Sequence, residues 1–453
     1  MSTARTTERR GTALGLALGL ILGLGLALAA PGAAFAGGPT LSVAVGNPVT
    51  AVDRTTTTYV KVAVTGGTSG GVRARTPVNV AFVIDRSGSM SGAKIAEARS
   101  AAIGALDTLG PDDIVAVVVY DDVVDVLVPS TKLTDRAAVK RAIRGIETRG
   151  STALFAGVVR GAAEVRKFAG SGTINRVVLL SDGLANVGPS SSSELGDLGA
   201  SLGREDVAVT TIGLGVGYNE DLMTLLARRS DGTHYFAERA SDLARVFRDE
   251  LSDLTSVVAK DVRVRIACAE GVRPVRVLGM DAWIDDRVVT ASMNQLYAGQ
   301  ERFVLVQVEV SPRGGEGSFD VARAEVSYRD PVEGRTATLS GTVGVRACRD
   351  EGEIARAEDG RVMADATVLL ATERARHAVL LRDQGKVEEA RGLLLDNVRE
   401  LDDAATRYKA PKLKAYGQKN KDDADDVGND ANWNVQRKAM KRTENYYEMQ
   451  QLH

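Results

Sequence analysis

A buried-strand pattern that runs directly into oxygen-bearing side chains constrains this chain more than any other stretch. Residues 79–90 read NVAFVIDRSGSM, and their apolar run, Val80–Ile84, is typical of a strand buried on both faces of a parallel sheet. Asp85, Ser87 and Ser89 then alternate along the chain as it leaves the strand. Open α/β sheets bind ligands beyond the carboxyl ends of their strands, so these side chains predict a binding site at that edge.

Two later stretches supply further oxygen atoms. Thr152 lies in a Gly-led loop before an expected helix, and a second apolar strand over 177–180 runs into Asp182. In this order and in these contexts, the three motifs together resemble the complete metal-ion-dependent adhesion site of a von Willebrand factor A domain. The resemblance implies a doubly wound, Rossmann-like α/β fold in which the first and fourth strands are neighbours. The metal ligands that it implies are Asp85, Ser87, Ser89, Thr152 and Asp182.

The chemistry of this residue set favours a hard divalent cation. All five side chains offer oxygen, which selects Mg²⁺, Mn²⁺ or Ca²⁺ over zinc or copper, and we expect Mg²⁺ first. Two carboxylates only balance the charge of the ion, which therefore stays electrophilic. By resemblance, an Asp or Glu side chain of a protein partner completes the metal's shell. The alternative is that Asp85 and Ser87 only cap a turn and Thr152 only caps a helix.

The patterns along the chain predict a multi-domain α/β plus β protein. Strand-like alternation before the α/β unit and period-two strands after it indicate one antiparallel β-sandwich, into which the A domain is inserted. A helical segment follows the sandwich. The expected boundaries are a signal peptide at 1–36, N-terminal sandwich strands at 37–75, the A domain at 76–258, the rest of the sandwich at 259–349, a helical hairpin at 350–410 and a polar, flexible tail at 411–453.

The N-terminus has the features of an export signal. Arg9 and Arg10 precede an uncharged run over 13–30, and Ala34-Phe35-Ala36 fits a cleavage site before Gly37. A retained membrane anchor is the alternative, because the run approaches the length of a bilayer span. After cleavage we expect no membrane span, and we expect a periplasmic or secreted bacterial protein. In such a compartment the only two cysteines, Cys268 and Cys348, are expected to form a disulfide.

Composition and motifs together favour protein binding over other functions. With 57 Lys and Arg against 59 Asp and Glu, no strong field selects for nucleic acid. None of the three histidines has an evident nucleophile partner, so we expect no enzymatic activity. The layout resembles bacterial relatives of the inter-alpha-trypsin inhibitor heavy chains and of the calcium-activated chloride channel regulators. It predicts an exported, metal-dependent adhesion or assembly module; the alternative is a structural cell-envelope component whose metal site only stabilises the fold. The oligomeric state stays open.

Overall fold

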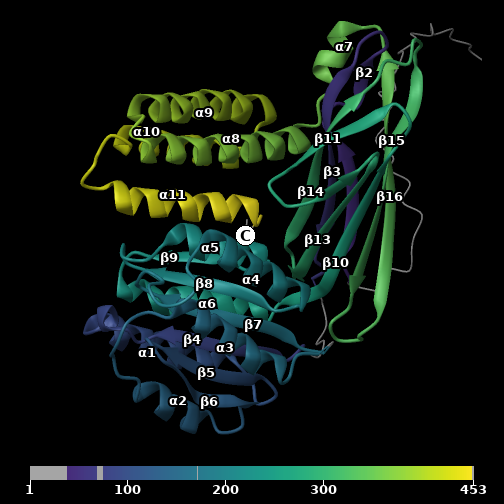
Figure 1. Cartoon of the computed structure of the whole chain (residues 1–453). Coiled ribbons are helices and arrows are strands. Elements are labelled where there is room, and N and C mark those ends of the chain that lie inside the picture. The colour runs from purple at the N-terminus through teal and green to yellow at the C-terminus, as the bar shows by residue number, and fades with distance from the viewer. Residues whose placement is uncertain (1–37, 69–74, 171, 451–453) are drawn as a thin grey trace, which may run out of the picture.

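The fold has three parts: an α/β domain, a β-sandwich and a bundle of helices (Figure 1). A computed structural model describes residues 38–68, 75–170 and 172–450. The predicted signal peptide lies outside these residues. Within them, no helix combines the length and apolar character needed to cross a bilayer.

The α/β domain is built on a six-stranded sheet with the order β6-β5-β4-β7-β8-β9. Its strands are β4 (Val78–Asp85), β5 (Ile114–Tyr120), β6 (Val124–Lys132), β7 (Ile174–Ser181), β8 (Ala208–Leu214) and β9 (His234–Ala237). All neighbouring pairs are parallel except the edge strand β6, which is antiparallel to β5. The predicted adjacency of the first and fourth strands, β4 and β7, is confirmed.

Helices cover both faces of this sheet, as a doubly wound fold requires. They are α1 (Ala93–Ala105), α2 (Arg136–Arg144), α3 (Leu154–Arg166), α4 (Ser192–Arg204), α5 (Glu220–Arg229) and α6 (Leu243–Leu254). Successive side chains of a strand point to opposite faces, so Phe82 packs with α1, α2 and α6, and Val83 packs with α3, α4 and α5. Loops follow the carboxyl ends of the strands, and the loop after β4 exposes Gly88 and Ser89 to solvent.

The β-sandwich contains strands from both sides of the α/β domain, as predicted. One sheet has the order β1 (Thr40–Val45), β3 (Thr56–Thr65), β14 (Glu301–Val310), β11 (Val272–Leu278). The other has the order β12 (Trp283–Asp285), β13 (Val288–Tyr297), β10 (Val257–Cys268), β15 (Gly317–Arg329), β16 (Thr336–Cys348), β2 (Val49–Ala51). Strand β3 pairs with β14 along its whole length. The α/β domain is thus an insertion in the sandwich.

The α/β domain meets the sandwich at the amino ends of its parallel strands. Arg176, near the start of β7, is fully buried and donates to Gln295 Oε1 at 2.8 Å and to Tyr297 OH at 3.1 Å. Lys260 of β10 donates to the carbonyl of Thr173 at 2.6 Å. Because these contacts fill the amino edge of the sheet, its carboxyl edge faces away from the sandwich.

Up to residue 450, where the description of the chain ends, five helices follow the sandwich: α7 (Glu351–Arg356), α8 (Gly360–Asp383), α9 (Val387–Tyr408), α10 (Pro411–Asp426) and α11 (Trp433–Glu448). Helix α8 covers the outer face of the first sheet, where Val362, Ala366 and Leu369 pack on apolar side chains of β3, β11 and β14. Lys61 of β3 donates to Asp365 of α8 at 2.7 Å within this contact. The helical segment is therefore fixed to the sandwich.

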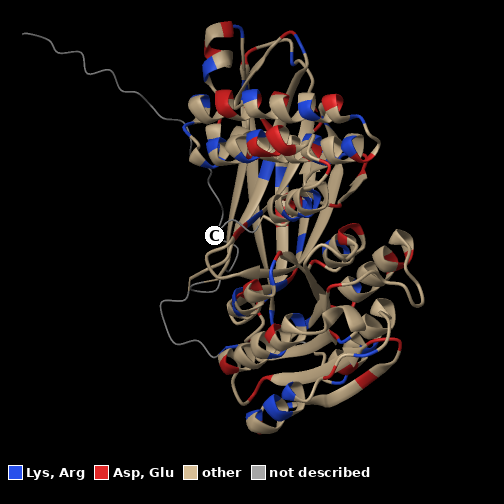
Figure 2. Ribbon diagram, turned by 90° about the vertical axis from the view of Figure 1, so that its left-hand side faces the viewer, with Lys and Arg blue, Asp and Glu red and all other residues tan. Residues whose placement is uncertain are grey.

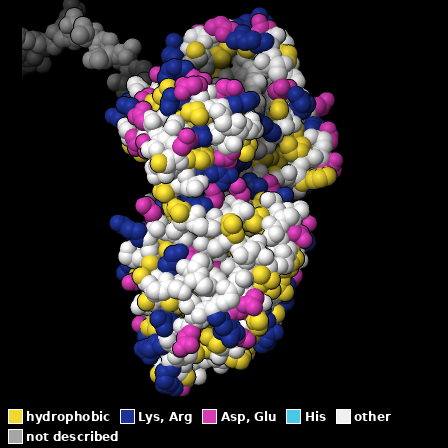
Figure 3. All heavy atoms as spheres, turned by 60° about the vertical axis from the view of Figure 1, so that its left-hand side comes forward, with side chains coloured by type: hydrophobic (Ala, Val, Ile, Leu, Met, Phe, Trp, Pro, Cys, Tyr) yellow, Lys and Arg dark blue, Asp and Glu magenta, His cyan; other side chains and the backbone are white. Residues whose placement is uncertain are grey.

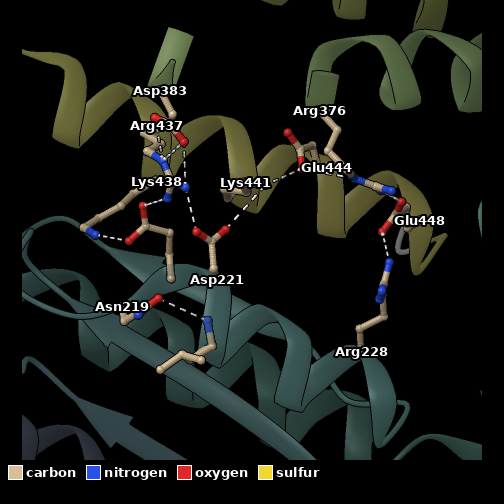
Figure 4. Close-up of polar contacts among 12 residues, drawn as sticks. Asn219, Asp221, Arg228, Arg376, Asp383, Arg437, Lys438, Lys441, Glu444 and Glu448 are labelled. Atoms are coloured by element: carbon tan, nitrogen blue, oxygen red, sulfur yellow. Dashed lines mark hydrogen bonds and ion pairs between the residues drawn. The ribbon is translucent and has the colours of Figure 1, made fainter. Parts of the chain in front are cut away.

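The prediction of a flexible tail at 411–453 was wrong, because α10 and α11 are helices of this bundle. Polar composition suggested disorder, but the charges meet partners from distant parts of the chain. Figure 4 shows that α11 lies between α8 and α5, where Arg437 contacts Asp383 of α8 at 2.9 Å and Asp221 of α5 at 2.6 Å. Figure 2 shows that positions of acidic and basic residues are interspersed along the helices of this part of the molecule.

The prediction of a disulfide was also wrong: Cys268 and Cys348 are free thiols, and both are buried. The strand order explains why. Cys268 ends β10 opposite Ala322 of β15, whereas Cys348 ends β16 opposite Ala51 of β2. Strand β15 lies between β10 and β16, so the two cysteines are held apart. The Cys348 thiol donates to Glu353 Oε2 at 3.3 Å.

Thiol titration checks this correction. The purified chain, unfolded in denaturant without reductant, is expected to react with two equivalents of a thiol reagent, because neither sulfur is bonded to the other. The folded chain is expected to react slowly, since both side chains are buried. Full titration only after reduction would contradict the structure.

The buried His234 predicts how stability depends on pH. Thr211 Oγ1 lies 2.9 Å from Nδ1 and Tyr218 OH lies 3.3 Å from Nε2, and burial lowers the pKa of this imidazole to about 3. Below about pH 6.5 the unfolded chain binds a proton that the folded chain does not, so the free energy of unfolding falls as the pH drops from about 6.5 towards 3. Urea unfolding across this range should show a weaker decline in His234→Gln. The same substitution at the exposed His377 of α8 is the control for replacing a histidine by glutamine.

Candidate metal centre

The first loop of the site leaves β4 and folds back on its own aspartate. Asp85 is fully buried; its Oδ1 accepts from the backbone N–H of Ser87 at 2.8 Å, and its Oδ2 accepts from the hydroxyl of Ser181 at 2.7 Å. Ser87 Oγ lies 3.0 Å from Ser89 Oγ. The alternation of polar residues seen in the sequence thus becomes a compact cluster of oxygen atoms at the carboxyl edge of the sheet.

Asp182, which follows β7, joins this cluster because β7 lies beside β4. Ser89 Oγ donates to Asp182 Oδ1 at 2.6 Å. The ammonium group of Lys94, in the first turn of α1, contacts the other oxygen, Oδ2. A carboxylate that is almost wholly buried thereby holds a hydroxyl and a cation side by side.

Thr152 completes the set from the loop before α3. An added Cβ on Gly183 would lie 3.1 Å from Thr152 Oγ1 and 3.5 Å from Ser89 Oγ, so glycine lets these two hydroxyls approach the backbone after Asp182. Asn186 Oδ1 accepts from the backbone N–H of Thr152 at 3.0 Å and fixes this loop. The structure thus brings together all five side chains that the sequence singled out.

Backbone hydrogen bonds lock the first loop to the loop of Thr152. The N–H of Gly88 donates to the carbonyl of Gly150 at 3.1 Å, and the N–H of Arg149 donates to the carbonyl of Arg86 at 2.8 Å. Gly150 has a φ of 68° and lies so close to Asp122 that a Cβ would clash at 1.9 Å from its Oδ1. A glycine is required there for both reasons.

Charges beneath the loops hold them in place. Arg86 Nε and Arg149 Nε each contact Asp121 Oδ2 at 2.8 Å, and Asp121 is fully buried. The hydrogen bonds from both arginines lower the pKa of Asp121, although its burial acts in the opposite direction. Arg86, at the position between the two motif residues, is thus part of the scaffold.

Burial raises the pKa of the Asp85 carboxyl to about 6, against the opposing effect of its hydrogen bonds from Ser87 and Ser181. The nearby charge of Asp182 adds to the rise. Two acidic groups held this close in a buried setting favour a positive charge between them. Lys94 supplies a positive charge on one side of this arrangement.

The donor set fits a hard divalent cation. It consists of two carboxylates and three hydroxyls, and Thr152 Oγ1 donates to no protein acceptor in the part of the chain that the structure describes. No group of three or more His, Cys, Asp or Glu residues that could hold a metal occurs among those same residues. The site contains only two carboxylates, so it is not such a group, and its remaining ligands would be neutral hydroxyl oxygens.

Three residues of the site were missed by sequence reasoning: Lys94, Ser181 and Asn186. Ser181 stands directly before Asp182, so its hydroxyl at the end of the strand could have been noticed in the sequence. Lys94 and Asn186 gave no such signal, because their contacts depend on how α1 and the loop after β7 fold back over the sheet edge.

Exposed apolar side chains stand around this cluster. Val123, Leu184 and Val216 are 51%, 55% and 50% exposed, and each lies in a loop that follows a strand of the sheet. Leu184 follows Asp182 by two residues, and Val216 precedes Gly217, whose added Cβ would lie 2.8 Å from the carbonyl oxygen of Asp182. The site is therefore an oxygen cluster with an apolar rim.

On the face shown in Figure 3, basic and acidic side chains alternate without forming a patch of one sign.

Known proteins resemble this chain over different lengths. The uncharacterized protein sll0103 of Synechocystis is 26% identical over 285 residues, which cover 59% of this chain and 65% of that protein. Inter-alpha-trypsin inhibitor heavy chain H3 of Rattus norvegicus is 30% identical over 172 residues, or 36% of this chain and 19% of the heavy chain. The chain thus spans less than two thirds of either relative.

Solved structures share the fold more widely. A von Willebrand factor type A structure from Catenulispora acidiphila superposes with a TM-score of 0.64 at 19% identity, covering 83% of this chain and 89% of that one. The family profile of the von Willebrand factor type A domain matches residues 79–249, which include all five oxygen-bearing side chains of the site. Residues 79–249 of the chain are therefore a von Willebrand factor type A domain, and this A domain is the α/β unit that carries the site.

Proposed function

We propose that the carboxyl edge of the A domain binds a divalent cation, Mg²⁺ first and Mn²⁺ or Ca²⁺ otherwise, and through it an acidic side chain of a protein partner. The observation that carries this proposal is the convergence of Asp85, Ser87, Ser89, Thr152 and Asp182 at the carboxyl edge of the sheet, where Ser89 is exposed to solvent. In this proposal the protein is an adhesion or assembly module and not an enzyme.

The surroundings of the site support a protein partner. The bound cation would supply the positive charge that a carboxylate needs, and Asp85 and Asp182 would hold it. The apolar rim of Val123, Leu184 and Val216 suits contact with a protein surface, because removing exposed aliphatic side chains from water favours binding. We propose further that the protein acts outside the cytoplasm, on the basis of the signal-like sequence at 1–36.

Calorimetric titration of Mg²⁺, Mn²⁺ and Ca²⁺ into the chain tests the metal site. The wild type is expected to bind one cation, Asp85→Ala to bind none, and Ser89→Ala to bind about tenfold more weakly, since it loses one neutral ligand. Asp112→Ala is the matched control, because this exposed carboxylate lies before β5, at the opposite edge of the sheet. Equal binding by the wild type and Asp85→Ala would contradict the proposal.

Partner retention separates the proposed function from a purely structural metal. Retention of envelope proteins by the immobilised chain should require the cation, be lost with a chelator and be lost in Asp85→Ala. The structural alternative would be favoured if the cation raises the melting temperature of the chain but neither the chelator nor Asp85→Ala changes the retention of partners.

A further inference from the structure

The loop between β8 and α5, residues 215–219, touches both the candidate metal centre and the C-terminal helix. At one end of the loop, Gly217 is packed against the backbone of Asp182, since an added Cβ would lie 2.8 Å from its carbonyl oxygen. A shift of this loop would therefore move or release the backbone of a residue that the site uses. The position of the loop is part of the geometry of the site.

Helix α11 holds this loop through a buried lysine. Lys438 Nζ donates to the carbonyl of Tyr218 at 2.8 Å, pairs with the carboxylate of Glu220 and lies 4.4 Å from the centroid of the Tyr218 ring. The side chains of Lys438 and Glu220 are 5% and 7% exposed. A desolvated pair of this kind is well defined in geometry, and removing one partner leaves the other charge buried.

The neighbouring arginine connects the same loop to the rest of the helical segment. Arg437 contacts Glu220 and lies 2.6 Å from Asp221 on the A-domain side, and it lies 2.9 Å from Asp383 at the end of α8 (Figure 4). One guanidinium therefore joins the first turn of α5 to a helix that is fixed to the sandwich. The planar fork of Arg suits several carboxylates at once, which the point charge of Lys does not.

The far end of α11 is attached to the sandwich itself. The side-chain amide of Gln450 accepts from the backbone N–H of Phe303 at 2.6 Å and donates to the carbonyl of the same residue at 2.8 Å. Between these ends, Asn445 Oδ1 accepts from the backbone N–H of His234 at 3.2 Å. Helix α11 thus runs from β14 of the sandwich, past β9, to the loop beside Asp182.

From these contacts we propose that Arg437 and Lys438 are positioning residues of the metal centre, although they lie far outside the A domain in sequence. They hold the β8–α5 loop against Asp182, so that the affinity for the cation depends on the docking of α11. Coupling between two sites is reciprocal, so the bound cation stabilises this docking in return. This inference rests on the proposed function for its cation-binding part.

Hydrogen exchange of the cation-free chain tests the structural part. In Lys438→Met and Arg437→Gln, backbone amides of 215–222 and 182–187 are expected to exchange about tenfold faster, because the loop loses its support. Arg442→Gln is the matched control: it is an exposed basic residue of the same helix, and it should leave both segments unchanged. The amides of β4 and β10 should stay as protected as in the wild type, which shows that the variants are folded.

Titration with Mg²⁺ tests the functional part. The dissociation constant is expected to rise about tenfold in Lys438→Met and Arg437→Gln and to stay unchanged in Arg442→Gln. Unchanged affinity and unchanged exchange at 182–187 in both variants would overturn the inference and leave the proposed function standing.

The two hypotheses also fail separately in the opposite case. If the wild type binds no cation, the proposed function fails, and exchange alone decides whether α11 positions the loop. Faster exchange at 182–187 in Lys438→Met would then support positioning, and unaltered exchange would overturn it.

Discussion

The pairing of β3 with β14 is the contact on which the whole arrangement depends. The two strands are in register from Thr56 opposite Val310 to Thr65 opposite Glu301, although the entire A domain lies between them in the chain. The sandwich can close only if the inserted domain returns its ends to the same place. A doubly wound fold does so here, because β4 begins and the connection from α6 to β10 ends near the amino edge of one sheet. That edge becomes the junction, and the opposite edge is left for the site.

Much of this could be predicted from the sequence, because it is written in local patterns. The apolar run before Asp85, the alternation of Asp85, Ser87 and Ser89, and the strand before Asp182 are short-range signals with a known spatial meaning. They predicted the fold, the insertion and the convergence of the oxygen-bearing residues. The sequence pattern does not determine which ion binds, because that choice depends on the binding free energy of each ion relative to its hydration.

The two errors have a common origin in contacts between distant segments. Residues 411–453 are polar and look solvated, yet Lys438 and Arg437 are neutralised by Glu220 and Asp221 of another domain. Cys268 and Cys348 are separated by a strand whose place in the sheet follows from register and not from composition. The polarity of a segment indicates whether such segments are usually ordered. In this chain the order of α11 depends on buried ion pairs, which form only when residues from distant parts of the sequence are in place.

The placement of the site opposite the junction determines how the molecule would carry force. Both covalent connections of the A domain leave from the amino edge, next to Arg176 and Lys260. Tension applied at the carboxyl edge would therefore run lengthwise down the parallel strands and load their hydrogen bonds in shear, the direction in which many bonds must break together. Helix α11 offers a second route to the sandwich, from Lys438 to Gln450. The load would be shared between the hydrogen bonds of the sheet and the side-chain contacts that hold the helix.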